Sequence, residues 1–113
     1  MEVEVRIHST DVADAVRAYA ARRLRFALGR FASRVGRVVV RISDANGARG
    51  GIDQRCQVSA DLVPSGRVVL EHVDADLFTA IDRASDRVGQ AFGREVRKMR
   101  EARTQHDSIR TQP

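Results

Sequence analysis

The sequence predicts an α+β domain with the element order β-α-β-β-β-α. Four short segments alternate apolar and polar residues, which is typical of half-buried strands. Two longer segments, one after the first strand and one near the end, repeat apolar residues with a helical period. The chain has 113 residues and no internal repeat, so we expect one domain with one core.

The first strand is expected over residues 2–8, where Val3, Val5 and Ile7 alternate with charged residues. The first helix follows and covers about 22 residues, which corresponds to about 33 Å. Its apolar stripe comprises Val12, Val16, Ala20, Leu24, Ala27 and Phe31. Three residues can cap its start, namely Ser9, Thr10 and Asp11, and Asp14 in the first turn suits the helix dipole.

Three further strands are expected at residues 37–43, 52–63 and 67–73. The inward side chains of the first two are Val38, Val40, Ile42, Cys56, Val58, Ala60 and Leu62. Glycine-rich residues 44–51, with Asn46-Gly47 and Gly50-Gly51, predict a loop, and residues 64–66 a tight turn.

The second helix is expected from about Asp76 to about Arg103, capped by Asp74 or Asp76. Its buried side is predicted to carry Leu77, Ile81, Ala84, Val88, Phe92 and Met99. Residues 104–113 show no periodicity, so we expect residues 1–103 to form the domain and residues 104–113 a flexible tail.

The lengths of the connections predict the topology. The first helix is long enough to cross over between parallel strands, whereas short turns join the last three strands into an antiparallel meander. Both helices need an apolar partner. We therefore expect a four-stranded mixed sheet with two roughly parallel helices packed on one face.

Charge is unevenly distributed along the chain, which has 20 basic and 15 acidic residues and a net charge of +5. The stretch from Arg17 to Ser43 holds eight arginines and no acidic residue. A genome rich in G and C can explain why 19 of the basic residues are arginine, but it does not explain the clustering. Such asymmetry indicates a polyanionic partner, either nucleic acid or an anionic surface.

Helical geometry places most of these cations on the outward sides of the two helices. On the second helix, Arg83, Arg87, Arg94 and Lys98 share one sector, with Arg97 close by and Asp82 and Asp86 on a flank. On the first helix, Arg22 and Arg25 point outward, whereas Arg23 and Arg30 share a flank near Tyr19 and Phe26. Side by side, the two ridges predict one basic surface; the alternative is a solvated charged face without a macromolecular partner.

RNA is favoured over DNA, because no helix-turn-helix, zinc-finger or basic-zipper pattern is present. A module with two parallel helices over a sheet also resembles the double-stranded RNA-binding fold.

Enzyme chemistry has little support in the sequence. His8, His72 and His106 are far apart, so we expect no metal site, and the single Cys56 is expected to be a buried thiol. We expect no catalytic residue, cofactor or small-molecule substrate. Without a signal peptide or a membrane span, we expect a cytoplasmic protein with no membrane partner.

Each helix carries a recognisable motif. The first lies in residues 14–31 and comprises Asp14, Ala15, Val16, Arg17, Tyr19, Arg22, Arg23, Leu24 and Phe31. The second opens the second helix and comprises Asp76, Leu77, Phe78, Thr79, Ala80, Ile81 and Asp82. Together these motifs resemble the ribosome hibernation-promoting factor and ribosome-associated inhibitor A family of bacteria. The resemblance covers roughly residues 2–103, and the element order agrees with it.

The resemblance implies a cytoplasmic factor that binds ribosomal RNA of the small subunit in the channel for messenger and transfer RNA. There it would block translation by steric exclusion during stress or stationary phase. Together with the helical geometry, it predicts the following RNA-binding residues: His8, Arg22, Arg23, Arg25, Arg30, Arg83, Arg87, Arg94, Arg97 and Lys98.

The second helix departs from the family pattern at Gln90, Gly93 and Val96, where basic residues or a helix former are usual. Gly89 and Gly93 each weaken a helix by about 1 kcal/mol relative to alanine. No dimerising extension follows residue 103, so we expect a short form that is a monomer. The alternative function is a regulatory module whose basic face binds an acidic protein or an anionic surface.

Overall fold

The computed structural model describes residues 1–8, 13–45 and 53–111, with only the backbone of residue 13 and of residues 104–111. Its elements follow the predicted order. They are β1 (Glu2–Ile7), α1 (Ala13–Leu28), the 3₁₀-helix η1 (Gly29–Arg34), β2 (Val35–Asp44), β3 (Gln54–Leu62), β4 (Arg67–Asp74) and α2 (Leu77–Thr111).

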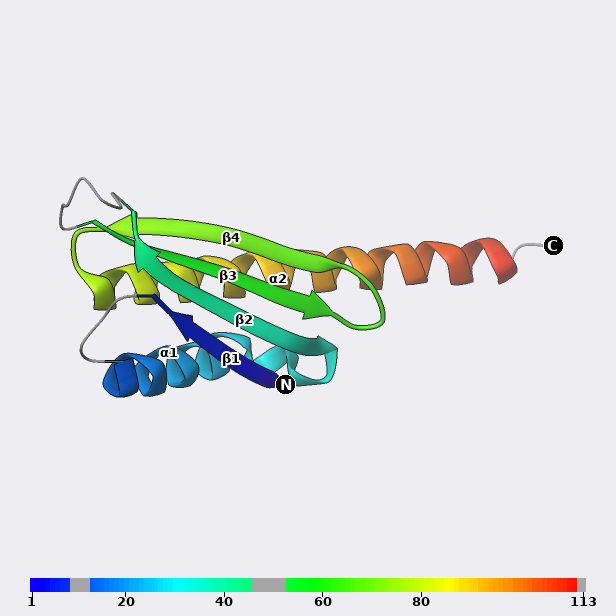
Figure 1. Cartoon of the computed structure of the whole chain (residues 1–113). Coiled ribbons are helices and arrows are strands. Elements are labelled where there is room, and N and C mark those ends of the chain that lie inside the picture. The colour runs from blue at the N-terminus through cyan, green and yellow to red at the C-terminus, as the bar shows by residue number, and fades with distance from the viewer. Residues whose placement is uncertain (9–12, 46–52, 112–113) are drawn as a thin grey trace.

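The four strands form one sheet in the order β1-β2-β3-β4. β1 pairs in parallel with β2, so that Val5 lies opposite Val40, whereas the pairs β2–β3 and β3–β4 are antiparallel. Both helices cover the same face of the sheet and run side by side in the same direction (Figure 1). The predicted fold class and topology are therefore confirmed.

The core lies between the sheet and the helices. The inward side chains predicted for β2 and β3 are all buried. On α1, Val16, Ala20 and Leu24 are fully buried, as predicted, but Leu28 takes the position in the core that was expected for Ala27. Ala27 instead faces α2, where the two helices meet.

The first helix is shorter than predicted, because α1 ends at Leu28 and the chain continues as a 3₁₀-helix. Gly29 is a poor helix former, and Phe31 leaves helical geometry at φ −111° and ψ 19°. The expected capping residues Ser9, Thr10 and Asp11, together with Val12, lie outside the described residues, as do residues 46–51 of the predicted loop.

The second helix begins as predicted. The Asp76 carboxylate accepts hydrogen bonds from the Thr79 backbone N–H at 2.8 Å and from its hydroxyl at 2.7 Å. These bonds cap the helix and hold the pKa of Asp76 below its ordinary value of 3.8. Along the helix, Ile81, Ala84 and Val88 are buried, as predicted.

The end of this helix was placed too early, because the backbone stays helical to Thr111 instead of ending near Arg103. Extending an existing helix fixes one residue for each hydrogen bond gained, so helix-forming residues such as Glu101 and Ala102 can continue it without a core. The C-terminal part of α2 projects beyond the sheet (Figure 1). Among the described helices, none is long and apolar enough to cross a membrane.

Candidate nucleic-acid interface

The outward side of α2 carries exposed cations, and three of them lack a carboxylate partner in the part of the chain that the structure describes. Arg83, Arg94 and Arg97 are exposed and have no carboxylate partner among the side chains that the structure describes. Lys98 pairs with Glu95 one turn earlier at 3.4 Å, with 70% of its side chain exposed. Such a pair contributes little and does not prevent the ammonium from meeting another anion.

Arg87 belongs to the same sector but leans toward the sheet. Its guanidinium donates a hydrogen bond to the Glu71 carbonyl of β4 at 3.1 Å. The basic ridge of α2 therefore extends over the β4 edge of the sheet rather than toward α1.

The outward side of α1 presents Arg22 and Arg25, both exposed as predicted. The Arg22 guanidinium lies 5.6 Å from the centre of the Tyr19 ring. Arg25 has no carboxylate partner among the described side chains. These two guanidinium groups are available to an external anion.

Arg23 was predicted to face an external anion, but in the structure it is paired with carboxylates of α2. Its guanidinium makes ion pairs with Asp82 at 3.0 Å and with Asp86 at 3.1 Å. Tyr19, one turn earlier on α1, donates its hydroxyl proton to Asp82, and this bond raises the pKa of Tyr19 above its ordinary value of 10.0. The expected single basic surface is thus interrupted between the helices by an acidic pair.

The partners of Arg23 were not identified from the sequence, although a signal was present. Tyr19 and Arg23 are four residues apart on one helix, and Asp82 and Asp86 are four apart on the other. Two such i,i+4 pairs occupy matching flanks when helices lie side by side. Their complementary chemistry could have predicted the contact.

The helices approach closely at Gly89, and this contact explains the two glycines of α2. A Cβ atom at Gly89 would lie 3.0 Å from the Ala27 carbonyl oxygen, closer than side chains normally come to backbone. A Cβ atom at Gly93 would lie 3.1 Å from the edge of the Phe31 ring. Both glycines reduce helix propensity, but Gly89 lets α2 pack closely against α1, and Gly93 makes room for the Phe31 ring of η1.

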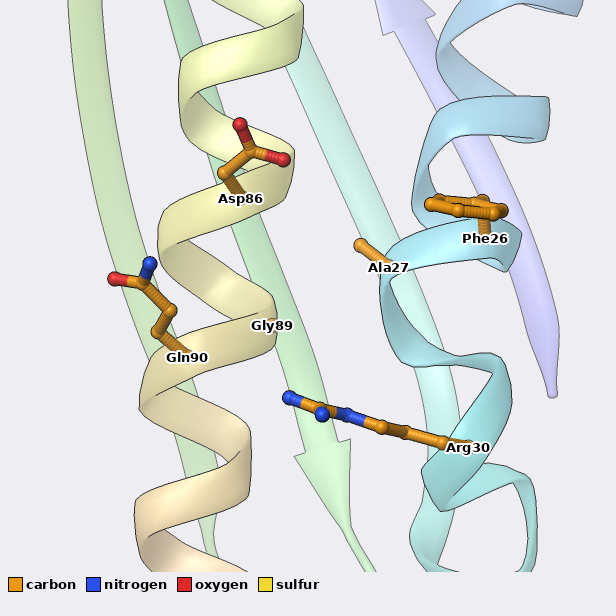
Figure 2. A pocket seen from close by; sticks show the side chains of 6 residues that line it. All are labelled: Phe26, Ala27, Arg30, Asp86, Gly89 and Gln90. Atoms are coloured by element: carbon orange, nitrogen blue, oxygen red, sulfur yellow. The ribbon is translucent and has the colours of Figure 1, made fainter.

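Beside this contact lies an open hollow of about 420 Å³ between the two helices. It is lined by Phe26, Ala27, Arg30, Asp86, Gly89 and Gln90 (Figure 2). Arg30 extends from η1 toward α2 in this view. Its guanidinium lies 4.7 Å from the centre of the Phe31 ring, and it has no carboxylate partner among the described side chains.

His8 is not part of the helical surface. It follows β1 directly, is exposed, and donates its backbone N–H to the Ile42 carbonyl of β2 at 2.9 Å. The structure therefore groups the predicted helical residues into two ridges and leaves His8 at the end of the sheet.

The outer face of the sheet, opposite the helices, also carries arginines, and most of them are paired. Arg6 and Arg37 both bind Glu4, and their hydrogen bonds hold the pKa of Glu4 below its ordinary value of 4.5. Arg55 pairs with Glu71 at 3.1 Å and Arg67 with Asp61 at 2.7 Å. Arg41 is exposed there and has no carboxylate partner among the described side chains.

No group of three or more metal-ligating side chains occurs in the described part of the chain. Cys56 is fully buried, and burial raises the pKa of its thiol to about 12, so it is not a nucleophile at neutral pH. The exposed guanidinium groups described above fit the binding of an anion.

Comparison with known proteins agrees with this geometry. The sequence profile of the family described as "Sigma 54 modulation protein / S30EA ribosomal protein" matches residues 3–101. No curated protein sequence matches the chain.

Two solved structures resemble the protein. The N-terminal domain of Protein Y from Thermus thermophilus is 30% identical, with a TM-score of 0.68, over 83% of this chain and 98% of that chain. A ribosomal subunit interface protein from Coxiella burnetii is 10% identical and also has a TM-score of 0.68, over 84% of this chain and 97% of that chain. The second likeness concerns the fold alone.

Proposed function

Because this chain belongs to the Sigma 54 modulation protein / S30EA ribosomal protein family, we propose that it binds ribosomal RNA of the small ribosomal subunit and blocks translation there. In this proposal the domain occupies the channel for messenger RNA and for transfer RNA in the A and P sites. It acts in the cytoplasm during stress or stationary phase, and its mechanism is steric exclusion without chemistry.

One observation supports this proposal above the others: Arg25, Arg83, Arg94 and Arg97 on the outward sides of the helices have no carboxylate partner among the described side chains. Arg94 illustrates the reason, because Gln90 and Lys98 occupy the positions four residues away and no acid is within reach on the helix. Guanidinium groups bind phosphate oxygens through two parallel hydrogen bonds and release condensed counterions on binding RNA. A row of unpaired arginines on two parallel helices thus suits an RNA backbone.

The test is cosedimentation of the purified protein with small ribosomal subunits over a series of salt concentrations. We expect binding that weakens steeply with salt, and a loss of roughly tenfold in affinity for each of Arg94→Glu and Arg97→Glu, since hydrogen bonds to charged groups contribute about 1.5–3 kcal/mol.

Arg41→Glu is the matched control, because Arg41 is also exposed, has no carboxylate partner among the described residues, and lies on the opposite face. It should bind nearly as well as the unchanged protein. Equal losses for Arg41→Glu and Arg94→Glu would contradict an RNA-binding surface on the helices. Partner binding that survives nuclease treatment would instead favour the regulatory protein-interaction module.

A further inference from the structure

Phe26 on α1 is the most exposed of the large apolar side chains that the structure describes, at 79% of its surface. Single exposed apolar residues are common and by themselves indicate nothing. Phe26 differs in its surroundings, because the Arg23 guanidinium lies 5.8 Å from its ring centre and Arg22 and Arg25 are nearby in sequence. The ring is thus an aromatic face set among cations.

The hollow beside Phe26 has small residues at its base and polar side chains at its sides. The close contact of Ala27 with Gly89 forms the floor, since neither residue has a side chain long enough to fill the space. Arg30 of η1 and Asp86 of α2 line it from opposite sides (Figure 2). A flat ligand lying against Phe26 would therefore meet a hydrogen-bond donor on one side and an acceptor on the other.

We propose that Phe26 and this hollow bind an unstacked base of single-stranded RNA, with the phenyl ring as stacking platform and Arg30 and Asp86 facing the base edge. The inference rests on the proposed function and adds a contact to a base, whereas the arginine ridges contact phosphates. Stacking on an aromatic side chain beside a basic groove is a general mode of single-strand recognition.

An apolar protein partner fits this site less well. Docking of a protein needs a contiguous apolar patch. The exposed valines Val63, Val69 and Val73 belong instead to the sheet and its turn. Phe78 packs edge-on against Tyr19, with ring centres 4.9 Å apart. Phe26 is therefore an isolated ring among charges, as expected for a contact with a single base.

The experiment measures binding of the full chain to a mixed-sequence single-stranded RNA and to an abasic strand of the same length and charge. For Phe26→Ala we expect roughly tenfold weaker binding to the RNA and no change with the abasic strand, because only the RNA can stack. The salt dependence should not change, since the ring contacts no phosphate.

Two matched variants separate stacking from burial of apolar surface. Phe26→Leu keeps an apolar side chain without a π face and should bind like Phe26→Ala. Phe26→Trp should bind at least as well as the unchanged protein, with its fluorescence quenched by the RNA and not by the abasic strand.

The inference is overturned if Phe26→Ala binds RNA normally, if it loses affinity equally for both strands, or if Phe26→Leu binds as well as the unchanged protein. In each of these cases the proposed function stands as long as Arg94→Glu weakens binding to both strands. If the unchanged protein binds neither strand nor the small subunit, the proposed function fails, and this inference fails with it.

Discussion

Arginine is abundant on both the outer face of the sheet and the outward side of the helices, but its partners differ between the two. On the sheet, Arg6, Arg37, Arg55 and Arg67 are each paired with a carboxylate. On the helices, Arg25, Arg83, Arg94 and Arg97 have none among the described side chains. The number of arginines therefore does not distinguish the two faces, whereas the share of them that is paired with a carboxylate does.

The architecture of the two faces explains the difference. In a sheet, side chains on neighbouring strands lie about 4.5–5.5 Å apart at Cβ, so residues distant in sequence become partners. On the outward side of a helix, only residues three or four positions away are within reach. Such positions around Arg94 hold no acid, so its charge stays available.

The largest effect is expected when the acidic residues of the sheet are removed, because the sheet arginines would then lack carboxylate partners like those of the helices. The triple variant Glu4→Gln, Asp61→Asn and Glu71→Gln should free four arginines on the outer face. Because free cations release counterions from RNA, we expect roughly tenfold tighter binding of single-stranded RNA at low salt, measured by fluorescence anisotropy.

The salt dependence of this triple variant should also become steeper, and the gain should persist when Arg94 is replaced by Glu. An unchanged affinity would show that the sheet arginines do not become available when their partners are lost.

Removing the ion-pair partners of Arg23 should raise the affinity for RNA and lower the stability of the fold. The gain in affinity should be smaller than that of the triple variant. In the double variant Asp82→Asn and Asp86→Asn, Arg23 loses both ion pairs and Tyr19 loses its charged acceptor. We expect about threefold tighter RNA binding, since one more guanidinium is available while the amide oxygen at position 86 still offers an acceptor to a base in the hollow. The free energy of unfolding should fall by about 1 kcal/mol. Tyr19→Phe is the control, because it should lower stability without raising RNA affinity.

Alanine variants of Gly89 and Gly93 test the close contact that places the two basic ridges side by side. Alanine favours a helix by about 1 kcal/mol over glycine, yet at Gly89 it must displace the Ala27 backbone. We expect Gly89→Ala to lower the free energy of unfolding by about 1 kcal/mol in urea titrations. Gly93→Ala should cost less, because the Phe31 ring that it meets can move.

A stabilised Gly89→Ala variant would contradict the close approach of the helices. A cost for Gly93→Ala larger than that for Gly89→Ala would contradict the difference between backbone and side-chain neighbours.

The smallest effect concerns pH and Glu4. Its pKa is lowered in the folded protein, chiefly by hydrogen bonds from Arg6 and then from Arg37, so its contribution to stability is full above the ordinary pKa of 4.5. That contribution is lost as the pH falls through the lowered value. Compared with the unchanged protein, Glu4→Gln should therefore be less stable at pH 7, and the gap should close on acidification.

Urea unfolding at pH 7 and at a series of lower pH values measures this gap. A difference that stays constant with pH would show that the Glu4 carboxylate does not stabilise the sheet through its charge.

Much of the fold could be predicted from the sequence, because it depends on local patterns. Alternation over residues 37–43 identified the inward side chains of β2, and apolar spacing identified Val16, Ala20 and Leu24 on α1. The helix ends were predicted less well. No strong stop signal follows Arg103, whereas Gly29 ended α1 earlier than the apolar stripe indicated.

The site was predicted in part. Helical periodicity correctly predicted that Arg22, Arg94 and Arg97 are exposed. It could not show that Arg87 reaches the β4 carbonyl of Glu71, since that depends on how the helix lies on the sheet. Nor could it show that Phe26 borders a hollow, because the hollow exists only where two helices meet.

By itself, the sequence determined the strands, the apolar faces of the helices and the outward position of their cations, because each follows from the period of the local backbone. Tertiary structure alone decided which cations are neutralised by residues distant in the chain. Arg23 is neutralised by Asp86, a residue 63 positions away in the chain, and only the packing of α1 against α2 brings the two together. Charge compensation depends on distance in space, which no local period encodes.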